Sequence, residues 1–119
     1  MEQHERTLCK LSLGDDAFIE AALAGDGANK AASELDAKAH ALVRLGALIA
    51  LNASSPSYMS AIERARRAGA SEDEIVGTLI AVMPAVGAAT VVAAAPELGL
   101  GMGYDVAAAL EGGGVAPSA

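Results

Sequence analysis

The stretch SELDAKAHALVRLGALIAL, residues 33–51, decides the fold class of this chain. Its apolar residues recur at helical spacing along one stripe: Leu35, Ala39, Leu42, Gly46 and Ile49. We expect a long helix that begins near Ser33 or Asp36 and runs to Leu51. From Leu45 onward this helix is apolar on every side, which predicts burial inside an assembly.

A second informative stretch, AGASEDEI at residues 68–75, links two further helices. Gly69 is placed to end one helix in a left-handed conformation. Ser71 and Glu74, three residues apart, form a capping box that starts the next. We expect that helix to reach Met83, and Pro84 to kink or restart it before it runs on to Ala94.

Capping residues predict the shorter helices. Asp15 and Asp16 start a helix that ends near residue 23, and Asp105 caps a last one over residues 106–110. Ser55 or Ser57 is expected to cap a helix that ends near residue 68. Pro96 and Glu97 open a short helical turn, while the Gly, Asp and Asn content of residues 24–33 predicts a loop.

These segments predict an all-α fold, since we find no strand pattern, repeat or heptad. The expected organisation is an N-terminal arm at residues 1–13, a single helical domain at 14–111 and a flexible tail at 112–119. The composition explains how such a fold would be stabilised. Twenty-nine of the 119 residues are alanine and only 3% are aromatic. Because alanine buries little surface, we expect an obligate homo-oligomer whose subunit interfaces supply the missing burial.

Charge and cysteine content exclude several classes of partner. The net charge of −7 argues against nucleic acid and against an anionic membrane, because both require clustered Lys and Arg. Cys9 is the single cysteine, which excludes an internal disulfide and a cysteine-based zinc site. The charged first ten residues lack the apolar region of an export signal, so we expect a cytoplasmic protein. Residues 75–96 are uncharged, but Pro84 and Gly87 interrupt them, which favours buried helices over a membrane span.

Taken in order, these segments resemble the carboxymuconolactone decarboxylase-like family, which includes the alkylhydroperoxidase D-type proteins. The resemblance runs from about Leu35 to Leu110. It depends on Leu-Asp-Ala-Lys at residues 35–38, which opens the long helix, and on the Gly-Ala-Ser-Glu-Asp-Glu-Ile turn at 69–75. It implies a helical-bundle subunit that assembles as homotrimers or homohexamers, with sites near subunit contacts.

The redox members of that family use a Cys-x-x-Cys pair, a histidine four residues later and a glutamate on the preceding helix. The resemblance places these positions at Ser54, Ser57, Ala61 and Ala41. No thiolate can form there, and no proton relay serves the site. We therefore expect no thiol peroxidase activity. The decarboxylase branch is also affected, since its histidine position is Ala61 as well.

Three polar residues on the long helix are the candidate acid–base group. Asp36, His40 and Arg44 are spaced four residues apart and so share one side of the predicted helix. In this interpretation His40 is the acid or base, Asp36 orients it, and Arg44 binds a carboxylate. The alternative is a solvated stripe, or an ion pair between subunits through Glu63 or Glu97.

The serine-rich turn before the next helix is a second candidate. Ser54 and Ser57 lie at a predicted helix N-terminus, which favours anions, and Tyr58 could line the same pocket. Ordinary capping by the serines and packing by Tyr58 are the alternatives. Residues 63–67 are expected to be a solvated or interface face. We expect no cofactor, and no metal because no cluster of His, Asp and Glu has ligand spacing.

Two hypotheses follow. In the first, the protein binds or acts on a small carboxylate or lactone in a pocket between helices or subunits, with decarboxylation or isomerisation of the lyase type as the reaction that the resemblance implies. In the second, it is a non-catalytic oligomeric binding or scaffold protein whose ancestral site has decayed.

Overall fold

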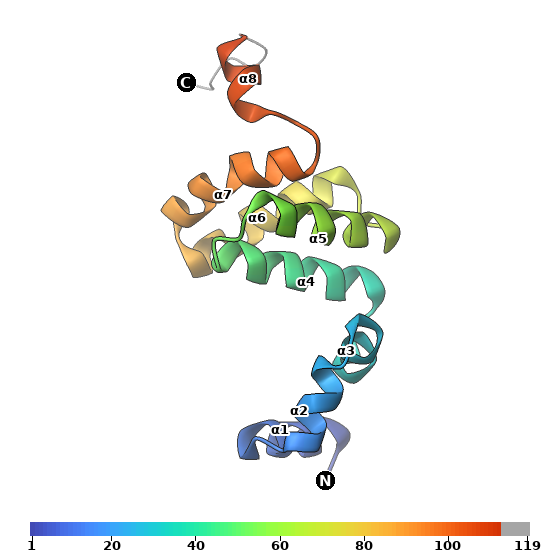
Figure 1. Cartoon of the computed structure of the whole chain (residues 1–119). Helices are drawn as coiled ribbons and strands as arrows, with labels where there is room; N and C mark the ends of the chain where they lie inside the picture. The colour runs from blue at the N-terminus through green and yellow to red at the C-terminus, as the bar shows by residue number, and fades with distance from the viewer. Residues whose placement is uncertain (113–119) are drawn as a thin grey trace. The chain divides into compact units, whose positions relative to one another are not determined.

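A computed structural model describes residues 1–112 of the chain and confirms the all-α prediction (Figure 1). Those residues form eight helices and no strand. The chain divides into two compact units, Met1–Asp36 and Ala37–Ala119, each described here by itself. The predicted tail at 112–119 lies outside the described residues except for Gly112, which follows the last helix.

The first unit contains α1 (Gln3–Leu13), α2 (Asp16–Leu23) and α3 (Asp26–Ser33). Gly14 has a φ of 65° and ends α1 in the left-handed conformation, and Asp15 caps α2 by accepting a hydrogen bond from the backbone N–H of Phe18. Lys10 lies 5.5 Å from the centre of the Phe18 ring. None of the three helices contains a buried residue, so this unit has no apolar core of its own.

The predicted boundary after residue 13 is not where the contacts divide the chain. Residues 3–13, expected as an arm, form helix α1, which packs against α2. The side chain of Gln3 donates a 3.0 Å hydrogen bond to Glu34 at the end of the same unit. These contacts group the first three helices together and move the boundary to Asp36.

The predicted loop at residues 24–33 was wrong, because most of it is helix α3. Asp26 lies in the first turn, where the helix dipole stabilises an acid. Asn29 donates a 2.7 Å hydrogen bond to the carbonyl of Ala22 and ties α3 to α2. The glycines that suggested a loop lie at the start of the helix, where they lower helix stability less than they would in its interior. Alanines, which favour a helix, follow them.

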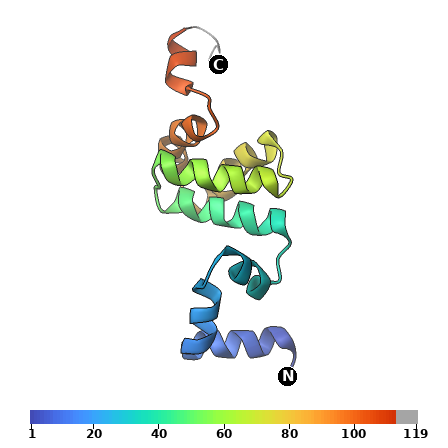
Figure 2. The ribbon, with the colours of Figure 1, turned by 45° about the vertical axis from the view of Figure 1, so that its right-hand side comes forward.

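The second unit contains α4 (Ala37–Ala50), α5 (Ser55–Arg67), α6 (Glu72–Val86), α7 (Ala88–Gly101) and α8 (Val106–Glu111). Helix α4 packs against α5, α6 and α7, and α7 packs in turn against α5 and α6 (Figure 2). The largest side chains that are fully buried come from these four helices: Leu45, Ile49, Tyr58, Ile62, Ile75 and Leu98.

The glycine–serine turn between α5 and α6 is confirmed. Gly69 has a φ of 91°, and Ser71 accepts a hydrogen bond from the N–H of Glu74 while the Glu74 carboxylate accepts one from the N–H of Ser71. The expected caps of the preceding helix are wrong. Helix α5 begins at Ser55 with Ser54 in the capping position, and the Ser54 side chain makes no capping hydrogen bond.

The sequence interpretation overestimated the effect of both interior prolines, because neither of them ends or starts a helix. Helix α6 continues past Pro84 to Val86, and the break falls at Gly87, whose φ of 91° is incompatible with a helix. Pro96 lies inside α7 and opens no new helix. A proline removes a single backbone N–H from the helix. Pro96 is on the exposed side of α7, where losing that hydrogen bond destabilises the helix least. Asp105 caps α8 as expected.

The uncharged residues 75–96 are divided between α6 and α7. The prediction that they are buried holds for part of the stretch, because Ile75, Leu79 and Val91 are buried whereas Ile80 is 67% and Val92 71% exposed. Within residues 1–112, no helix combines the length and the apolar content that crossing a bilayer would require.

The capping box at Ser71 predicts how the fold responds to acid. Hydrogen bonds from the Ser71 backbone and from Lys38 hold the pKa of Glu74 below its ordinary value of 4.5. A lowered pKa in the folded state contributes stability above pH 4.5 that is lost as the pH falls through the folded-state pKa. We expect Glu74→Gln, which keeps the capping geometry, to lose less stability than the parent between pH 5 and pH 3, measured by urea unfolding. An identical loss in both proteins would contradict this role.

Candidate functional site

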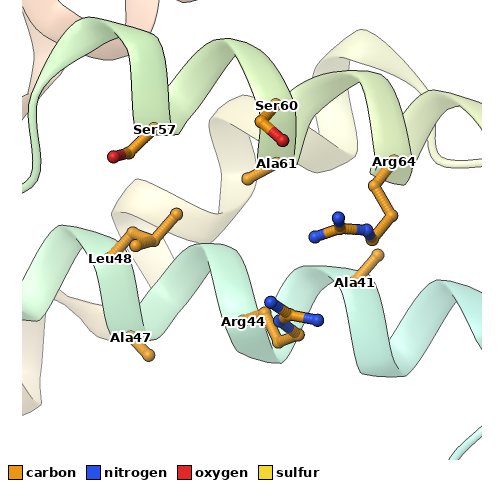
Figure 3. Close-up of a pocket in the computed structure, with 8 residues that line it drawn as sticks. All are labelled: Ala41, Arg44, Ala47, Leu48, Ser57, Ser60, Ala61 and Arg64. Atoms are coloured by element: carbon orange, nitrogen blue, oxygen red, sulfur yellow. The ribbon is translucent and has the colours of Figure 1, made fainter. Parts of the chain in front are cut away.

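A pocket of about 360 Å³ lies between α4 and α5 (Figure 3). Each of the two helices contributes four lining residues: Ala41, Arg44, Ala47 and Leu48 from α4, and Ser57, Ser60, Ala61 and Arg64 from α5. Each set contains one adjacent pair, and its other successive members are three positions apart, which places each set on one helical face. The pocket is therefore the space left between two facing helices whose contact residues are mostly small.

The lining is electropositive. Figure 3 shows the guanidinium of Arg64 extending from α5 toward α4, and that of Arg44 extending from α4 at the same end of the pocket. The hydroxyls of Ser57 and Ser60 belong to the α5 wall. None of the eight lining side chains is a carboxylate. The two guanidiniums and the two hydroxyls are all hydrogen-bond donors that an anion in the pocket could use.

Alanine makes room for this pocket. Ala41 and Ala61 are both buried, and each ends at its Cβ where a longer side chain would fill the space between the helices. Arg44 and Arg64 are half-buried, so their charged ends are partly shielded from water. A guanidinium in such a place binds an anion more strongly than one on an open surface.

The sequence predicted part of this site. Arg44 and Ser57, expected as ligand-binding residues, both line the pocket. Arg64 and Ser60 were missed, because residues 63–67 were interpreted as one solvated or interface face. The spacing of Ser57, Ser60 and Arg64 along one side of a helix was the signal that could have separated Arg64 from its charged neighbours.

The predicted acid–base group is not brought into the pocket as a unit. His40 is 5% exposed and is not among the pocket-lining residues, although Ala41 next to it is. Asp36 is exposed and precedes α4, at the end of the first unit. Of the three residues predicted to share one face, the pocket contains Arg44.

Tyr58 and Ser54 also lie away from the pocket lining. Ser54 is exposed in the capping position of α5, whereas Tyr58 is 0% exposed in the core. Within residues 1–112 the Tyr58 hydroxyl has no hydrogen-bond partner. Burial raises the pKa of Tyr58 above its ordinary value of 10.0, and the charge of Glu97 raises it further. The Ser55 hydroxyl donates a hydrogen bond to that Glu97 carboxylate.

This placement predicts that the Tyr58 hydroxyl is dispensable. A buried hydroxyl without a partner costs about 1–3 kcal/mol of desolvation. We expect Tyr58→Phe to raise the free energy of unfolding by about 1 kcal/mol in urea titrations. The same substitution should leave anion binding at the α4–α5 pocket unchanged. A loss of binding in this variant would instead give Tyr58 the ligand role that its sequence position suggested.

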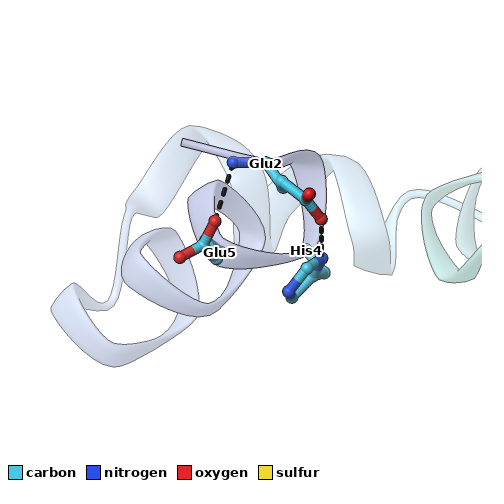
Figure 4. A group of neighbouring side chains, drawn as sticks. All are labelled: Glu2, His4 and Glu5. Atoms are coloured by element: carbon cyan, nitrogen blue, oxygen red, sulfur yellow. Dashed lines mark hydrogen bonds and ion pairs between the residues drawn. The ribbon is translucent and has the colours of Figure 1, made fainter.

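A second polar group, Glu2, His4 and Glu5, lies at the start of α1 (Figure 4). Its potential ligand atoms lie within 4.8 Å of one another, a proximity that the sequence interpretation missed. All three residues are exposed, and the two carboxylates already form the capping box of α1, with Glu5 accepting a 2.8 Å hydrogen bond from the N–H of Glu2. The helix dipole also disfavours a cation at this end. We therefore assign no metal site there.

Comparisons with protein families, with curated proteins and with solved structures found no match.

Proposed function

We propose that this protein is a carboxymuconolactone decarboxylase-like, non-thiol protein that binds a small carboxylate or carboxylate-bearing lactone in the α4–α5 pocket. The observation that carries this proposal is the pair of guanidiniums, from Arg44 and Arg64, on the lining of one small pocket. Guanidinium matches the planar carboxylate with two parallel hydrogen bonds.

The position of the pocket adds support from the family resemblance. Three of the four positions at which the resemblance places redox residues line the pocket, namely Ala41, Ser57 and Ala61. The same location would thus be the functional site in both kinds of protein. It would carry thiol chemistry in the redox members of the family and bind an anion in this chain. By analogy with the family we also propose assembly as a homo-oligomer, a trimer or a hexamer.

The test is a titration of the ¹⁵N-labelled protein with succinate, benzoate and the uncharged lactone γ-butyrolactone. We expect saturable shifts of the Ser57, Ser60 and Ala61 amides with the two carboxylates, and little response from the exposed Val92 on α7. Shifts spread evenly over the chain, or saturation by the neutral lactone alone, would contradict the proposed carboxylate site.

A lyase-type reaction is the second candidate, favoured by the buried His40 one residue from the pocket wall. An imidazole titration separates binding from catalysis, with the exposed His4 as an internal reference. If His40 titrates apart from His4 and responds to succinate, an acid–base role for His40 is supported. If the pocket amides respond and His40 does not, the protein binds its ligand without this histidine.

A further inference from the structure

The α4–α5 pocket has two chemically different ends. Figure 3 shows Arg44 and Arg64 at one end of the two facing helices, and Ala47, Leu48 and Ser57 at the other. We propose that the ligand is a short aliphatic monocarboxylate held in one orientation, with its carboxylate at the arginine end and its carbon chain at the Leu48 end. This inference rests on the proposed function and specifies which class of carboxylate the pocket prefers.

The arginine end is where the carboxylate is most stable. Both guanidiniums lie at this end, one from each helix, and both arginines are half-buried. In Figure 3 the Ser60 oxygen is directed toward the same end. Because the energy of a charge pair falls with distance and with exposure to water, an anion gains most beside the two guanidiniums. The positive charge of the lining therefore fixes which end of the ligand points this way.

The opposite end suits a hydrocarbon chain. Leu48 is half-buried and packs against the core, so it presents an apolar wall, and Ala47 adds a methyl group. The Ser57 oxygen points away from the two arginines in Figure 3. A methylene group gains by leaving water at such a wall. A second carboxylate there would lose hydration without a cation from these three side chains in return.

The size of the pocket limits the chain to a short one. Its volume of about 360 Å³ lies near the lower end of ligand pockets, which span about 300–1,000 Å³. Arg44 and Leu48 are four residues apart on α4, which corresponds to about 6 Å along the helix axis. Ala47 and Ser57 are exposed, so the far end of the pocket is open to water. Each methylene group should therefore contribute less than it would when fully buried.

A chain-length series tests the preference in the parent protein. Dissociation constants for acetate, propionate, butyrate and succinate are measured by NMR titration at physiological salt. From acetate to butyrate, we expect affinity to rise about two- to threefold per methylene group, compared with about fourfold for full burial. Succinate has the carbon chain of butyrate but ends in a second carboxylate, and it should bind about threefold more weakly or worse. Equal affinities along the series, or tighter binding of succinate than of butyrate, would overturn the inference.

A lysine at the apolar end should change the preference. Ala47 is exposed on α4, so Ala47→Lys is tolerated by the helix and places a cation where the second carboxylate of succinate would lie. We expect the ratio of succinate affinity to butyrate affinity to rise about threefold. Ala93→Lys, at an exposed alanine of α7 outside the pocket lining, is the matched control and should leave the ratio unchanged. An unchanged ratio in Ala47→Lys, or an equal rise in both variants, would overturn the inference.

The orientation itself is measured in the parent by nuclear Overhauser contacts with bound butyrate. Its terminal methyl group should contact the Leu48 methyls and not that of Ala41, which lines the arginine end one turn before Arg44. Contacts with Ala41 in place of Leu48 would overturn the orientation. If acetate, butyrate and succinate all fail to produce saturable shifts, the proposed function fails as well. If all three bind regardless of chain, the carboxylate site stands and this inference alone is overturned.

Discussion

Replacing Arg44 and Arg64 together with leucine should weaken succinate binding by about a hundredfold or more. Each charge-assisted hydrogen bond contributes about 1.5–3 kcal/mol, and about 1.4 kcal/mol corresponds to a tenfold change in affinity. Both residues are half-buried in the α4–α5 pocket, so water screens them less than it screens surface charges. Isothermal titration calorimetry at low and at physiological salt measures the effect, and each single substitution should account for part of it.

Arg67→Leu is the matched control for these substitutions. Arg67 belongs to the same helix α5 and is exposed, three residues beyond Arg64 and away from the pocket lining. Its removal changes the net charge as much as either single substitution does. We expect succinate affinity to change by less than about threefold in this variant, because water and salt screen an exposed charge outside the pocket more strongly than a half-buried one. If Arg67→Leu weakens binding as much as Arg44→Leu, the attraction is a property of overall charge and the pocket is not the site.

Leu45→Ala should destabilise the fold by about 3 kcal/mol, within the 2–5 kcal/mol range of large-to-small core substitutions. Leu45 is 0% exposed and packs where α4 meets its neighbouring helices, so truncation leaves a cavity. Leu51→Ala, just beyond the end of α4, removes the same atoms from a residue that is 77% exposed. We expect the free energy of unfolding of Leu51→Ala to differ from that of the parent by less than about 0.5 kcal/mol. Urea unfolding at fixed protein concentration compares the two.

The outcome that would contradict this comparison is a loss of similar size in both variants. Leu51 would then be covered in the assembled protein, and its exposure in the single chain would not describe its environment. Repeating the measurement at several protein concentrations separates the cases, because stability gained from subunit contact depends on concentration and stability from the core of one chain does not.

Local chemistry explains which predictions of the fold were right. Ser71 with Glu74, Asp15 and Asp105 each satisfy backbone N–H groups within three residues, so their effect can be interpreted from the sequence alone. Residues 24–33 were predicted wrongly because a helix that begins with glycine and aspartate has the same local composition as a loop. The N-terminal boundary was displaced because it depends on contacts such as that of Gln3 with Glu34, 31 positions away in the sequence.

The candidate site was predicted to a smaller extent. Arg44 stood out as the last charge before a long uncharged stretch, and Ser57 stood out at a helix N-terminus. Arg64 did not stand out, because its neighbours on α5 are also charged and only the packing of α4 against α5 selects which of them faces the pocket. Tyr58 was ambiguous for the same reason, since a tyrosine early in an amphipathic helix can face either a pocket or the core.

The sequence by itself determined that the chain is helical, where several of its helices are capped, and that thiol chemistry is absent from the positions that the resemblance assigns to it. These properties depend on residue type and on spacings of three or four positions, which a helix of any fold preserves. Only the tertiary structure decided that Arg44 and Arg64 share a pocket, that Tyr58 is in the core, and that His40 is buried and outside the pocket lining. The physical reason is that each of these facts depends on how one helix is rotated against another, and that rotation is set by side-chain packing between residues far apart in the sequence.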